Sequence, residues 1–388
     1  MLKKLGFGCM RLPLLDANDQ ASVDLEQMNR MVDTFLERGF NYFDTALPYH
    51  AYHSENFVRK ALVERHPRQA FLLATKLPPR MLKCEQDQQA IFSEQLEKCG
   101  VDFFDYYLLH NLGENSYAQA KKYGSFDFAK RKKQDGMVHK LGMSFHDTPE
   151  LLEEILAEHH ADLDFVQLQI NYIDWENPGI QSRRCYEIAR KYSLPIIVME
   201  PCKGGSLANV PEKAAELMRG YNPQASIPSW AIRYAAGLEG VRMVLSGMSN
   251  MAQVLDNTAY MDKFTPLNEE EHAILRQVVD IINADTAVAC TNCRYCVEHC
   301  PSDIPIPDYF ALYNSYRSTA SSNHSSQYVY YLNMTARHGK AEDCIACRAC
   351  EDVCPQHLEV SEYMKDVSKA FDNGPGLATS WPRKAEQK

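Results

Sequence analysis

Two cysteine runs with the same spacing constrain this chain more than any other feature of its sequence. The pattern C-x₂-C-x₂-C-x₃-C-P begins at Cys290 and returns from Cys344. This spacing is typical of bacterial-type ferredoxins with two [4Fe–4S] clusters, in which the fourth cysteine of each run binds the other cluster. The sequence therefore predicts Cys290, Cys293, Cys296 and Cys354 as ligands of one cluster and Cys344, Cys347, Cys350 and Cys300 as ligands of the second.

Zinc and disulfide bonds explain the cysteine pattern less well than iron–sulfur clusters do. Structural zinc sites use two separated C-x₂-C pairs, often with histidine, and need only four ligands each. Disulfide frameworks belong to small secreted domains, whereas this chain has 388 residues. The clusters and the remaining free thiols are expected in a reducing compartment, so the sequence predicts a cytoplasmic protein.

Composition excludes several classes of partner. The net charge is −10, which gives the chain no electrostatic bias towards nucleic acid or anionic membranes. It has no apolar stretch long enough to span a membrane, and its first residues lack the apolar run of a signal peptide. The hydrophobic fraction of 45% is enough for a sizeable core. We therefore expect a globular protein that binds neither membrane nor nucleic acid.

The segment 1–266 alternates short β-like runs with helical patterns. Most of the β-like runs are continuously apolar, as expected for strands buried on both faces. Eight such β–α units predict a (β/α)8 TIM barrel. A doubly wound open sheet is the alternative, but no G-x-G-x-x-G opens a first helix. The predicted strands are Leu5–Cys9, Asn41–Asp44, Phe71–Lys76, Phe104–His110, Lys140–Ser144, Phe165–Ile170, Pro195–Met199 and Val241–Ser246, and the predicted helices are 24–38, 54–65, 85–99, 116–134, 148–158, 180–193, 226–237 and 251–260.

A smaller C-terminal domain is expected after the barrel. Residues 267–289 are predicted to form a linking helix, and 290–360 a two-cluster ferredoxin-type domain. Between the two cysteine runs the patterning is helical, so we expect a mainly helical domain. Its predicted helices are Asp308–Arg317 and Gln327–His338, around a serine-rich turn at Ser318–Ser326. Residues 361–388 are predicted to form a short helix and a mobile tail from 373 onward.

Polar residues follow three successive predicted strands. Asp44 ends the second strand, Lys76 the third and His110 the fourth, and Tyr49 lies in the loop after the second. Each residue alone is ordinary, because aspartates cap helices, lysines are usually solvated and histidines are often packed. Active sites of (β/α)8 barrels lie at the carboxyl ends of the strands, where these four residues would meet. They are therefore candidate catalytic residues.

The four residue types fit the reduction of a carbonyl by hydride. The developing alkoxide needs an acid, and the ordinary pKa of tyrosine, about 10, is high for that task. A buried ammonium beside the tyrosine would lower its pKa. We therefore expect Lys76 to lower the pKa of Tyr49, Asp44 to hold Lys76, and His110 to orient the carbonyl oxygen.

Four segments of the chain resemble the signatures of the aldo-keto reductase superfamily. The resemblance covers roughly residues 3–260, and the cysteine runs place the chain near the branch with a C-terminal ferredoxin-type domain. It implies a TIM barrel, a nicotinamide cofactor across its C-terminal face, and a tetrad of Asp44, Tyr49, Lys76 and His110 with Tyr49 as proton donor. The matching segments are FDTALPY (43–49), LLATKLP (72–78), YYLLHNL (106–112) and GMVHKLGMS (136–144).

The resemblance also implies cofactor contacts. Ser144 and Gln167 match residues that hold the nicotinamide carboxamide, although Phe145 replaces the usual asparagine and Met199 the usual stacking aromatic ring. After the eighth strand, backbone N–H groups would bind phosphate at a helix N-terminus. No arginine stands at the position that usually selects NADP, so the sequence is compatible with either NADP or NAD as the cofactor. The contacts implied after that strand are Gly247, Ser249, Asn250, Gln253 and Asn257.

Three functions are compatible with this sequence. In the first, a carbonyl or alcohol reacts in the barrel and the clusters relay electrons to or from an external carrier such as ferredoxin or flavodoxin. A flavin would bridge hydride and one-electron chemistry there, although no flavin motif is visible. In the second, an ordinary carbonyl reductase keeps the clusters for stability. In the third, the barrel is inactive and the protein is an electron-transfer or sensor subunit, which an intact tetrad argues against.

Overall fold

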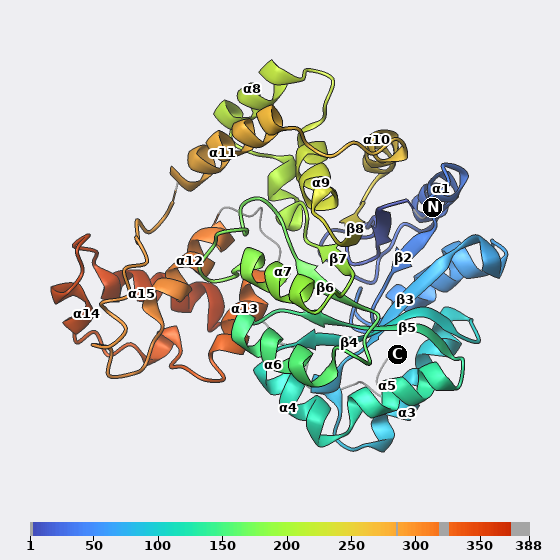
Figure 1. Cartoon of the computed structure of the whole chain (residues 1–388), viewed down its shortest axis with the longest axis horizontal. Coiled ribbons are helices and arrows are strands. Elements are labelled where there is room, and N and C mark those ends of the chain that lie inside the picture. The colour runs from blue at the N-terminus through green and yellow to red at the C-terminus, as the bar shows by residue number, and fades with distance from the viewer. Residues whose placement is uncertain (1–2, 285, 318–325, 374–388) are drawn as a thin grey trace.

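The computed structural model describes residues 3–284, 286–317 and 326–373. Within them, eight parallel strands close into one barrel in sequence order, with β1 paired to β8 (Figure 1). The predicted (β/α)8 fold is confirmed. The strands are β1 (Leu5–Gly8), β2 (Tyr42–Asp44), β3 (Leu72–Leu77), β4 (Phe104–Leu112), β5 (Val138–Phe145), β6 (Phe165–Gln169), β7 (Ile196–Met199) and β8 (Val241–Gly247).

The barrel is a packed core and not a pore. Apolar side chains from strands on all sides of it form one cluster that includes Tyr42, Leu108, Phe165 and Met243. A larger cluster fills the space between the strands and the surrounding helices. Because both faces of each strand are buried in this way, the strands are runs of apolar residues. The polar residues at their carboxyl ends are therefore exceptions to the local pattern.

The helices around the barrel follow the sequence signals closely. The Asp24 side chain caps α1, and Thr148 caps α6 directly before Pro149. The helices of this layer are α1 (Leu25–Glu37), α2 (Ser54–Val58) continued by a π-helical turn (Arg59–Val63), α3 (Gln86–Cys99), α4 (Glu114–Lys122), α5 (Ser125–Gln134), α6 (Pro149–His159), α7 (Ser182–Lys191), α8 (Glu212–Tyr221), α9 (Ile227–Gly237) and α10 (Met251–Asp262).

Two expectations for this layer are wrong. The single helix predicted over 116–134 is two helices, because Gly124 takes a left-handed conformation with φ +64° between α4 and α5. The helix α8 was not predicted at all. It packs against α11 (Glu269–Ala284), which occupies most of the predicted linking segment. Leu275 and Val278 of α11 are buried in that contact, so this helix rests on the barrel layer.

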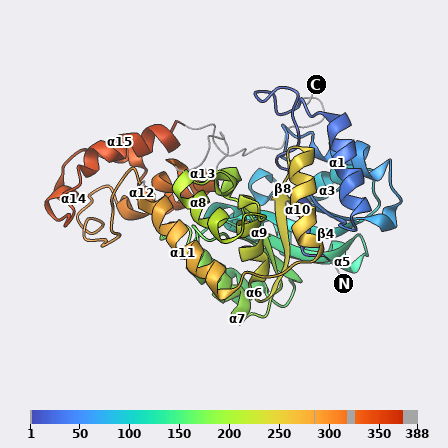
Figure 2. The same ribbon diagram turned by 90° about the horizontal axis from the view of Figure 1, so that it is seen from above.

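The C-terminal segment forms a lobe beside the barrel (Figures 1 and 2). Its core is aromatic and aliphatic, with Tyr309, Phe310, Tyr331 and Phe371 fully buried. The described helices are α12 (Ile306–Arg317), α13 (Ser326–Met334), α14 (Ala349–Asp352) and α15 (Val360–Phe371), so the predicted helical character holds. The predicted serine-rich turn and the tail lie almost entirely outside the described residues, at 318–325 and 374–388.

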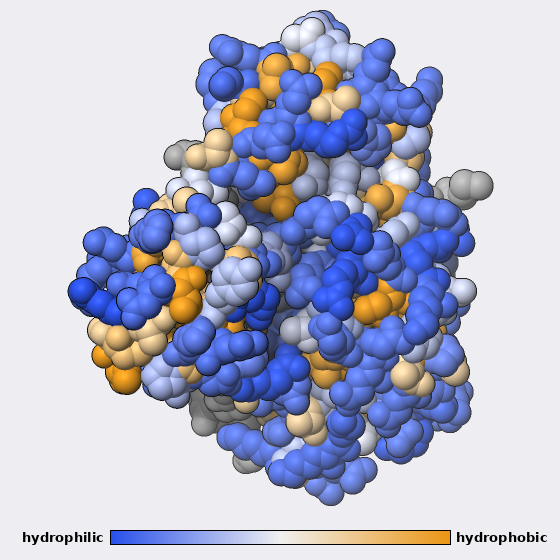
Figure 3. Space-filling view, turned by 60° about the vertical axis from the view of Figure 1, so that its left-hand side comes forward, coloured by the Kyte–Doolittle hydropathy of each residue, from blue (hydrophilic) through white to orange (hydrophobic). Residues whose placement is uncertain are grey.

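The described helices include none that is both long and apolar enough to cross a membrane. In Figure 3, which brings the C-terminal lobe towards the viewer, hydrophobic residues lie in small groups among hydrophilic ones. Two large hydrophobic side chains of the lobe are nevertheless well exposed, Tyr295 at 62% and Ile345 at 69%. Both residues lie within the cysteine runs.

Candidate functional site

The structure brings the four candidate catalytic residues together at the carboxyl ends of β2, β3 and β4. The Lys76 ammonium is buried and donates to Asp44 Oδ1 at 2.5 Å and to the carbonyl of Thr45 at 2.7 Å. It lies 5.0 Å from the centre of the Tyr49 ring. The rings of Tyr49 and His110 meet edge to face, with centroids 6.0 Å apart. A phenol beside a buried ammonium and an imidazole can act as a proton donor.

Burial sets the protonation states in this group. It raises the pKa of Tyr49, and the nearby Lys76 ammonium opposes that rise only in part. The expectation that Lys76 brings the pKa of Tyr49 below its ordinary value is therefore wrong, because desolvation of the phenolate outweighs the lysine. Burial, then Lys76 and His146, hold the pKa of His110 well below its ordinary value. Tyr49 is thus a protonated donor and His110 a neutral imidazole.

The backbone around this group is strained. Asn111 and Glu200, which directly follow His110 and Met199, have φ values of +53° and +55°. The residues 50–52 after Tyr49 also have positive φ, from +50° to +71°. Left-handed backbone at residues other than glycine costs about 1–3 kcal/mol each and gathers at functional sites. Strained backbone thus occurs at three places around the candidate catalytic residues, in β4 and in the segments after β2 and β7, as is typical of a functional site.

A buried polar network lies behind Lys76. Glu55 Oε1 accepts hydrogen bonds from Thr75 at 2.7 Å and from Gln95 at 2.9 Å, and Gln95 also donates to the carbonyl of Lys76. The hydroxyl of Tyr107 donates to Gln95. Glu55 Oε2 has no partner among the described residues. Burial raises the pKa of Glu55 to about 7, so this carboxyl is the titrating member of the network.

The Glu55→Gln variant is expected to remove a pH dependence of stability. Because the folded pKa of Glu55 is about 7 and the ordinary value is 4.5, the unfolded chain loses its proton first. The free energy of unfolding therefore falls as pH rises from about 4.5 to about 7, by about 3 kcal/mol. Urea unfolding followed by tryptophan fluorescence at pH 5 and pH 8 should show this fall in the wild type only. The same change in the free energy of unfolding between pH 5 and pH 8 in both proteins would contradict the raised pKa of Glu55.

Two of the residues predicted to hold the nicotinamide lie side by side. Ser144 of β5 pairs in register with Gln167 of β6, and both side chains are buried. The Ser144 hydroxyl accepts a hydrogen bond from the backbone N–H of Asn111 at 2.7 Å. Gln167 Oε1 is buried without a partner among the described residues. An unpartnered buried acceptor beside a hydroxyl fits a carboxamide group, which has both donor and acceptor atoms.

The predicted phosphate contacts after β8 fit less well. Gly247 ends the strand and Asn250 caps α10, accepting from the N–H of Gln253 at 3.0 Å. The N–H of Ser249, however, already donates to Gln253 Oε1 at 2.7 Å. Asn257 is buried, where it donates to Ser246 and accepts from Tyr260. Both polar atoms of the Asn257 side chain thus have partners inside the protein.

The sequence reading missed two charged residues in this region. Arg11, in the loop after β1, donates to Glu200 Oε1 at 2.9 Å, and Glu200 Oε2 accepts from the N–H of Gly204. The arginine also lies against Gly247, where an added Cβ would come within 3.3 Å of the Arg11 Cβ. Both charges follow strands at the carboxyl end of the barrel, which is the signal that could have found them. They connect the loops after β1, β7 and β8.

The cysteines divide into the two predicted groups. Cys290, Cys293, Cys296 and Cys354 line one hollow, and the other four line a second. Ile306 and Val360 border both hollows. In the described ranges, no group of histidine, cysteine, aspartate or glutamate side chains converges closely enough to hold a single metal ion. Thiols around a hollow, with no point of convergence, fit a cluster of several irons better than one ion.

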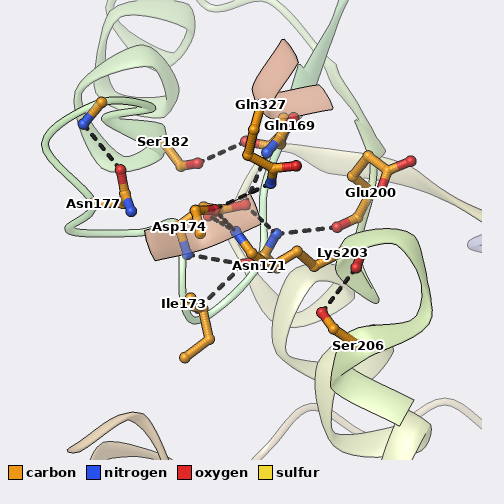
Figure 4. A network of polar contacts seen from close by, with 12 residues as sticks. Gln169, Asn171, Ile173, Asp174, Asn177, Ser182, Glu200, Lys203, Ser206 and Gln327 are labelled. Atoms are coloured by element: carbon orange, nitrogen blue, oxygen red, sulfur yellow. Dashed lines mark hydrogen bonds and ion pairs between the residues drawn. The ribbon is translucent and has the colours of Figure 1, made fainter. Parts of the chain in front are cut away.

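A buried polar network joins the lobe to the barrel (Figure 4). Asp174, after β6, accepts from Gln169 at 2.8 Å and Asn171 at 2.7 Å, and it forms a buried ion pair with Lys203, after β7. Lys203 also donates to the hydroxyl of Ser315 on α12 at 2.5 Å. The lobe is thus held against the loops at the carboxyl ends of the strands.

A (β/α)8 barrel with a buried lysine and aspartate beside a tyrosine and a histidine at its mouth, together with a cysteine-rich lobe, defines a class of oxidoreductase. The aldo/keto reductase family model matches residues 4–280. A 4Fe-4S dicluster domain model matches residues 289–358. The chain therefore belongs to the aldo/keto reductase family and carries a 4Fe-4S dicluster domain, which makes it an iron–sulfur oxidoreductase.

Solved structures of aldo-keto reductases share the barrel. The holo form of AKR11C1 from Bacillus halodurans is 25% identical, with a TM-score of 0.57, and the match covers 71% of this chain and 92% of that one. An aldo-keto reductase from Klebsiella pneumoniae in complex with NADPH is 18% identical, with a TM-score of 0.56, covering 72% and 96% of the two chains. The second likeness shows the fold alone. Each match leaves more than a quarter of this chain uncovered.

Proposed function

We propose that this protein reduces the carbonyl group of a small molecule with NADPH or NADH, or oxidises the matching alcohol, and that its clusters exchange electrons with an external carrier. The observation that carries the first half is the group of Asp44, Tyr49, Lys76 and His110 at the mouth of the barrel. Membership of the family establishes that the protein is an oxidoreductase. The carbonyl substrate and the electron transfer from the clusters to a carrier are what we propose.

In the reduction, Tyr49 gives its phenolic proton to the carbonyl oxygen. A nicotinamide bound beside Ser144 and Gln167 would supply two electrons as hydride to the carbonyl carbon. Lys76 lies next to the tyrosine and stabilises the phenolate left behind, while Asp44 holds the ammonium in place. Neutral His110 donates one ring N–H to the carbonyl oxygen and orients it. The product is an alcohol, and Tyr49 regains its proton from solvent.

The second half of the proposal rests on the surface of the C-terminal lobe. Cys293 and Cys347 are exposed, one beside each hollow. The exposed Tyr295 and Ile345 lie within the same two cysteine runs. Clusters bound there would supply one-electron transfer close to the surface. Exposed apolar side chains at such a place fit transient docking of a ferredoxin- or flavodoxin-type carrier. A flavin would be the group that connects hydride and one-electron chemistry.

Anaerobic spectroscopy tests whether the two halves are connected. NADPH, and then NADH, is added to the cluster-loaded protein while visible absorbance and low-temperature EPR are recorded, with dithionite as positive control. We expect bleaching and a reduced-cluster signal with the nicotinamide. The Cys347→Ala variant should lose electron exchange with the carrier but keep carbonyl reduction. The matched control is Cys84→Ala, which removes an exposed thiol of the barrel and should change neither.

If dithionite reduces the clusters but neither NADPH nor NADH does, with or without a carbonyl substrate, the proposed electron transfer between nicotinamide and clusters is wrong. The protein would then be a carbonyl reductase whose clusters stabilise the lobe. The buried contacts between lobe and barrel favour this second candidate, because loss of a cluster would loosen them. A fluorescent yellow chromophore released on denaturation would identify the flavin.

A further inference from the structure

One residue of the C-terminal lobe is inserted into the mouth of the barrel. Asn333, at the end of α13, is fully buried and donates to the carbonyl of His146 at 2.7 Å, after β5. It packs against Gly113, after β4, where an added Cβ would lie only 2.4 Å from the Asn333 amide nitrogen. Its Oδ1 accepts from Arg80, after β3, at 3.0 Å. Asn333 thus fixes three loops that follow neighbouring strands.

Arg80 is a partly buried cation without a counter-charge. It lies four residues beyond Lys76, and among the described residues its one hydrogen bond is to the neutral amide of Asn333. No carboxylate in the described part of the chain pairs with it, and its Nε is buried without a partner. Burial lowers the pKa of Arg80, with no acidic group to offset that effect. Arginine nevertheless stays protonated, so the charge remains.

Three described cations near the barrel mouth are each paired with carboxylates. Lys76 pairs with Asp44, and Arg11 pairs with Glu200. Arg337, which follows α13, lies 2.7 Å from Asp147 and 3.2 Å from Glu114. Burial of an unpaired charge is costly, and buried charges in proteins are normally paired. Among these described cations, Arg80 alone has no carboxylate partner.

The residue whose carbonyl accepts from Asn333, His146, adds a neutral polar side chain to this region. His146 Nδ1 is buried and has no partner among the described residues. Burial lowers the pKa of His146 to about 4, so its ring is neutral near pH 7. That pKa also responds to Lys76 and Glu200, which places the ring close to the candidate catalytic group. The ring of Tyr330 on α13 covers it from the lobe side, at a centroid distance of 6.0 Å.

We propose that Arg80, held in place by Asn333 of the C-terminal lobe, binds an anionic group of the substrate. The substrate would be a carbonyl compound that carries a carboxylate or a phosphate, and this inference rests on the proposed carbonyl chemistry. The planar guanidinium offers several N–H donors to either oxyanion. The lobe would then contribute to substrate selection in the barrel as well as carrying the clusters.

Binding and turnover of matched aldehydes test the proposal. The probes are 4-oxobutanoate and its neutral methyl ester, with glyceraldehyde 3-phosphate and glyceraldehyde to separate carboxylate from phosphate. We expect calorimetric titration of the wild type to show one anion bound about 10–100-fold more tightly than its neutral partner. Arg80→Gln should remove that preference and leave the neutral aldehyde unchanged. In turnover, the loss should appear in KM and much less in kcat.

Control variants keep the result interpretable. Arg337→Gln removes an adjacent arginine that already has carboxylate partners and should keep the anion preference. Arg80→Lys should restore it only in part, because an ammonium lacks the planar fork. Equal binding of charged and neutral aldehydes by the wild type would overturn the proposal, as would an unchanged preference in Arg80→Gln. Anion binding through Arg80 without NADPH oxidation would instead refute the carbonyl chemistry and leave the anion site standing.

Discussion

The Tyr49→Phe variant is expected to reduce carbonyl compounds about 10²–10⁴-fold more slowly than the wild type. The change removes only the hydroxyl that donates the proton, while the ring can keep its edge contact with His110. Lys76 retains Asp44 and the carbonyl of Thr45 as partners, so the variant should fold normally. NADPH oxidation under saturating aldehyde, measured by absorbance, gives the effect on kcat.

The matched control for this experiment is Tyr42→Phe. Tyr42 lies two residues before Asp44 in β2, inside the barrel, and its hydroxyl is buried without a partner among the described residues. Removing that hydroxyl breaks no hydrogen bond of the described chain, so kcat should stay near that of the wild type. Near-normal turnover by Tyr49→Phe, with clusters and fold intact, would mean that another group supplies the proton.

The Lys203→Met variant is expected to destabilise the protein by about 3–5 kcal/mol. Both members of the Lys203–Asp174 pair are fully buried, so removing the lysine leaves an uncompensated carboxylate in the interior. The same change removes the hydrogen bond to Ser315, which lies on the C-terminal lobe. Urea unfolding should show the loss of stability, and hydrogen exchange should show faster opening of α12 in the native protein.

Two further variants show whether charge burial is the cause. The double variant Lys203→Met with Asp174→Leu removes both charges and should be more stable than Lys203→Met alone. Lys191→Met breaks the exposed pair with Glu153 and should have little effect on stability. A loss below about 1 kcal/mol in Lys203→Met would show that water or a rearranged side chain compensates Asp174.

The sequence contained enough local information for the barrel, the cysteine groups and the central tetrad. Apolar runs and helix caps act within a few residues, and the closed parallel barrel places every strand end on one face. Asp44, Lys76 and His110 were therefore predictable as neighbours from their positions on successive strands. The break at Gly124 was also a local signal, which the reading of one long helix over 116–134 overlooked.

The sequence could not determine where individual polar side chains point. Ser249 and Asn257 were expected to face a cofactor, yet Gln253, Ser246 and Tyr260 already bond to them. Side chains of these types cap and crosslink loops as readily as they bind ligands. The choice between the two depends on neighbours that packing supplies, and spacing along the chain does not encode them.

By itself, the sequence determined the barrel, the pairing of cysteine runs and the class of chemistry, because each follows from short-range patterns repeated in a symmetric fold. Only the tertiary structure decided how the lobe meets the barrel. Arg80 and Asn333 are 253 residues apart in sequence, and Lys203 and Ser315 are 112 apart. Contacts between such distant segments arise from the packing of whole helices and strands. A local sequence pattern therefore cannot predict that a residue of the C-terminal lobe lies in the mouth of the barrel.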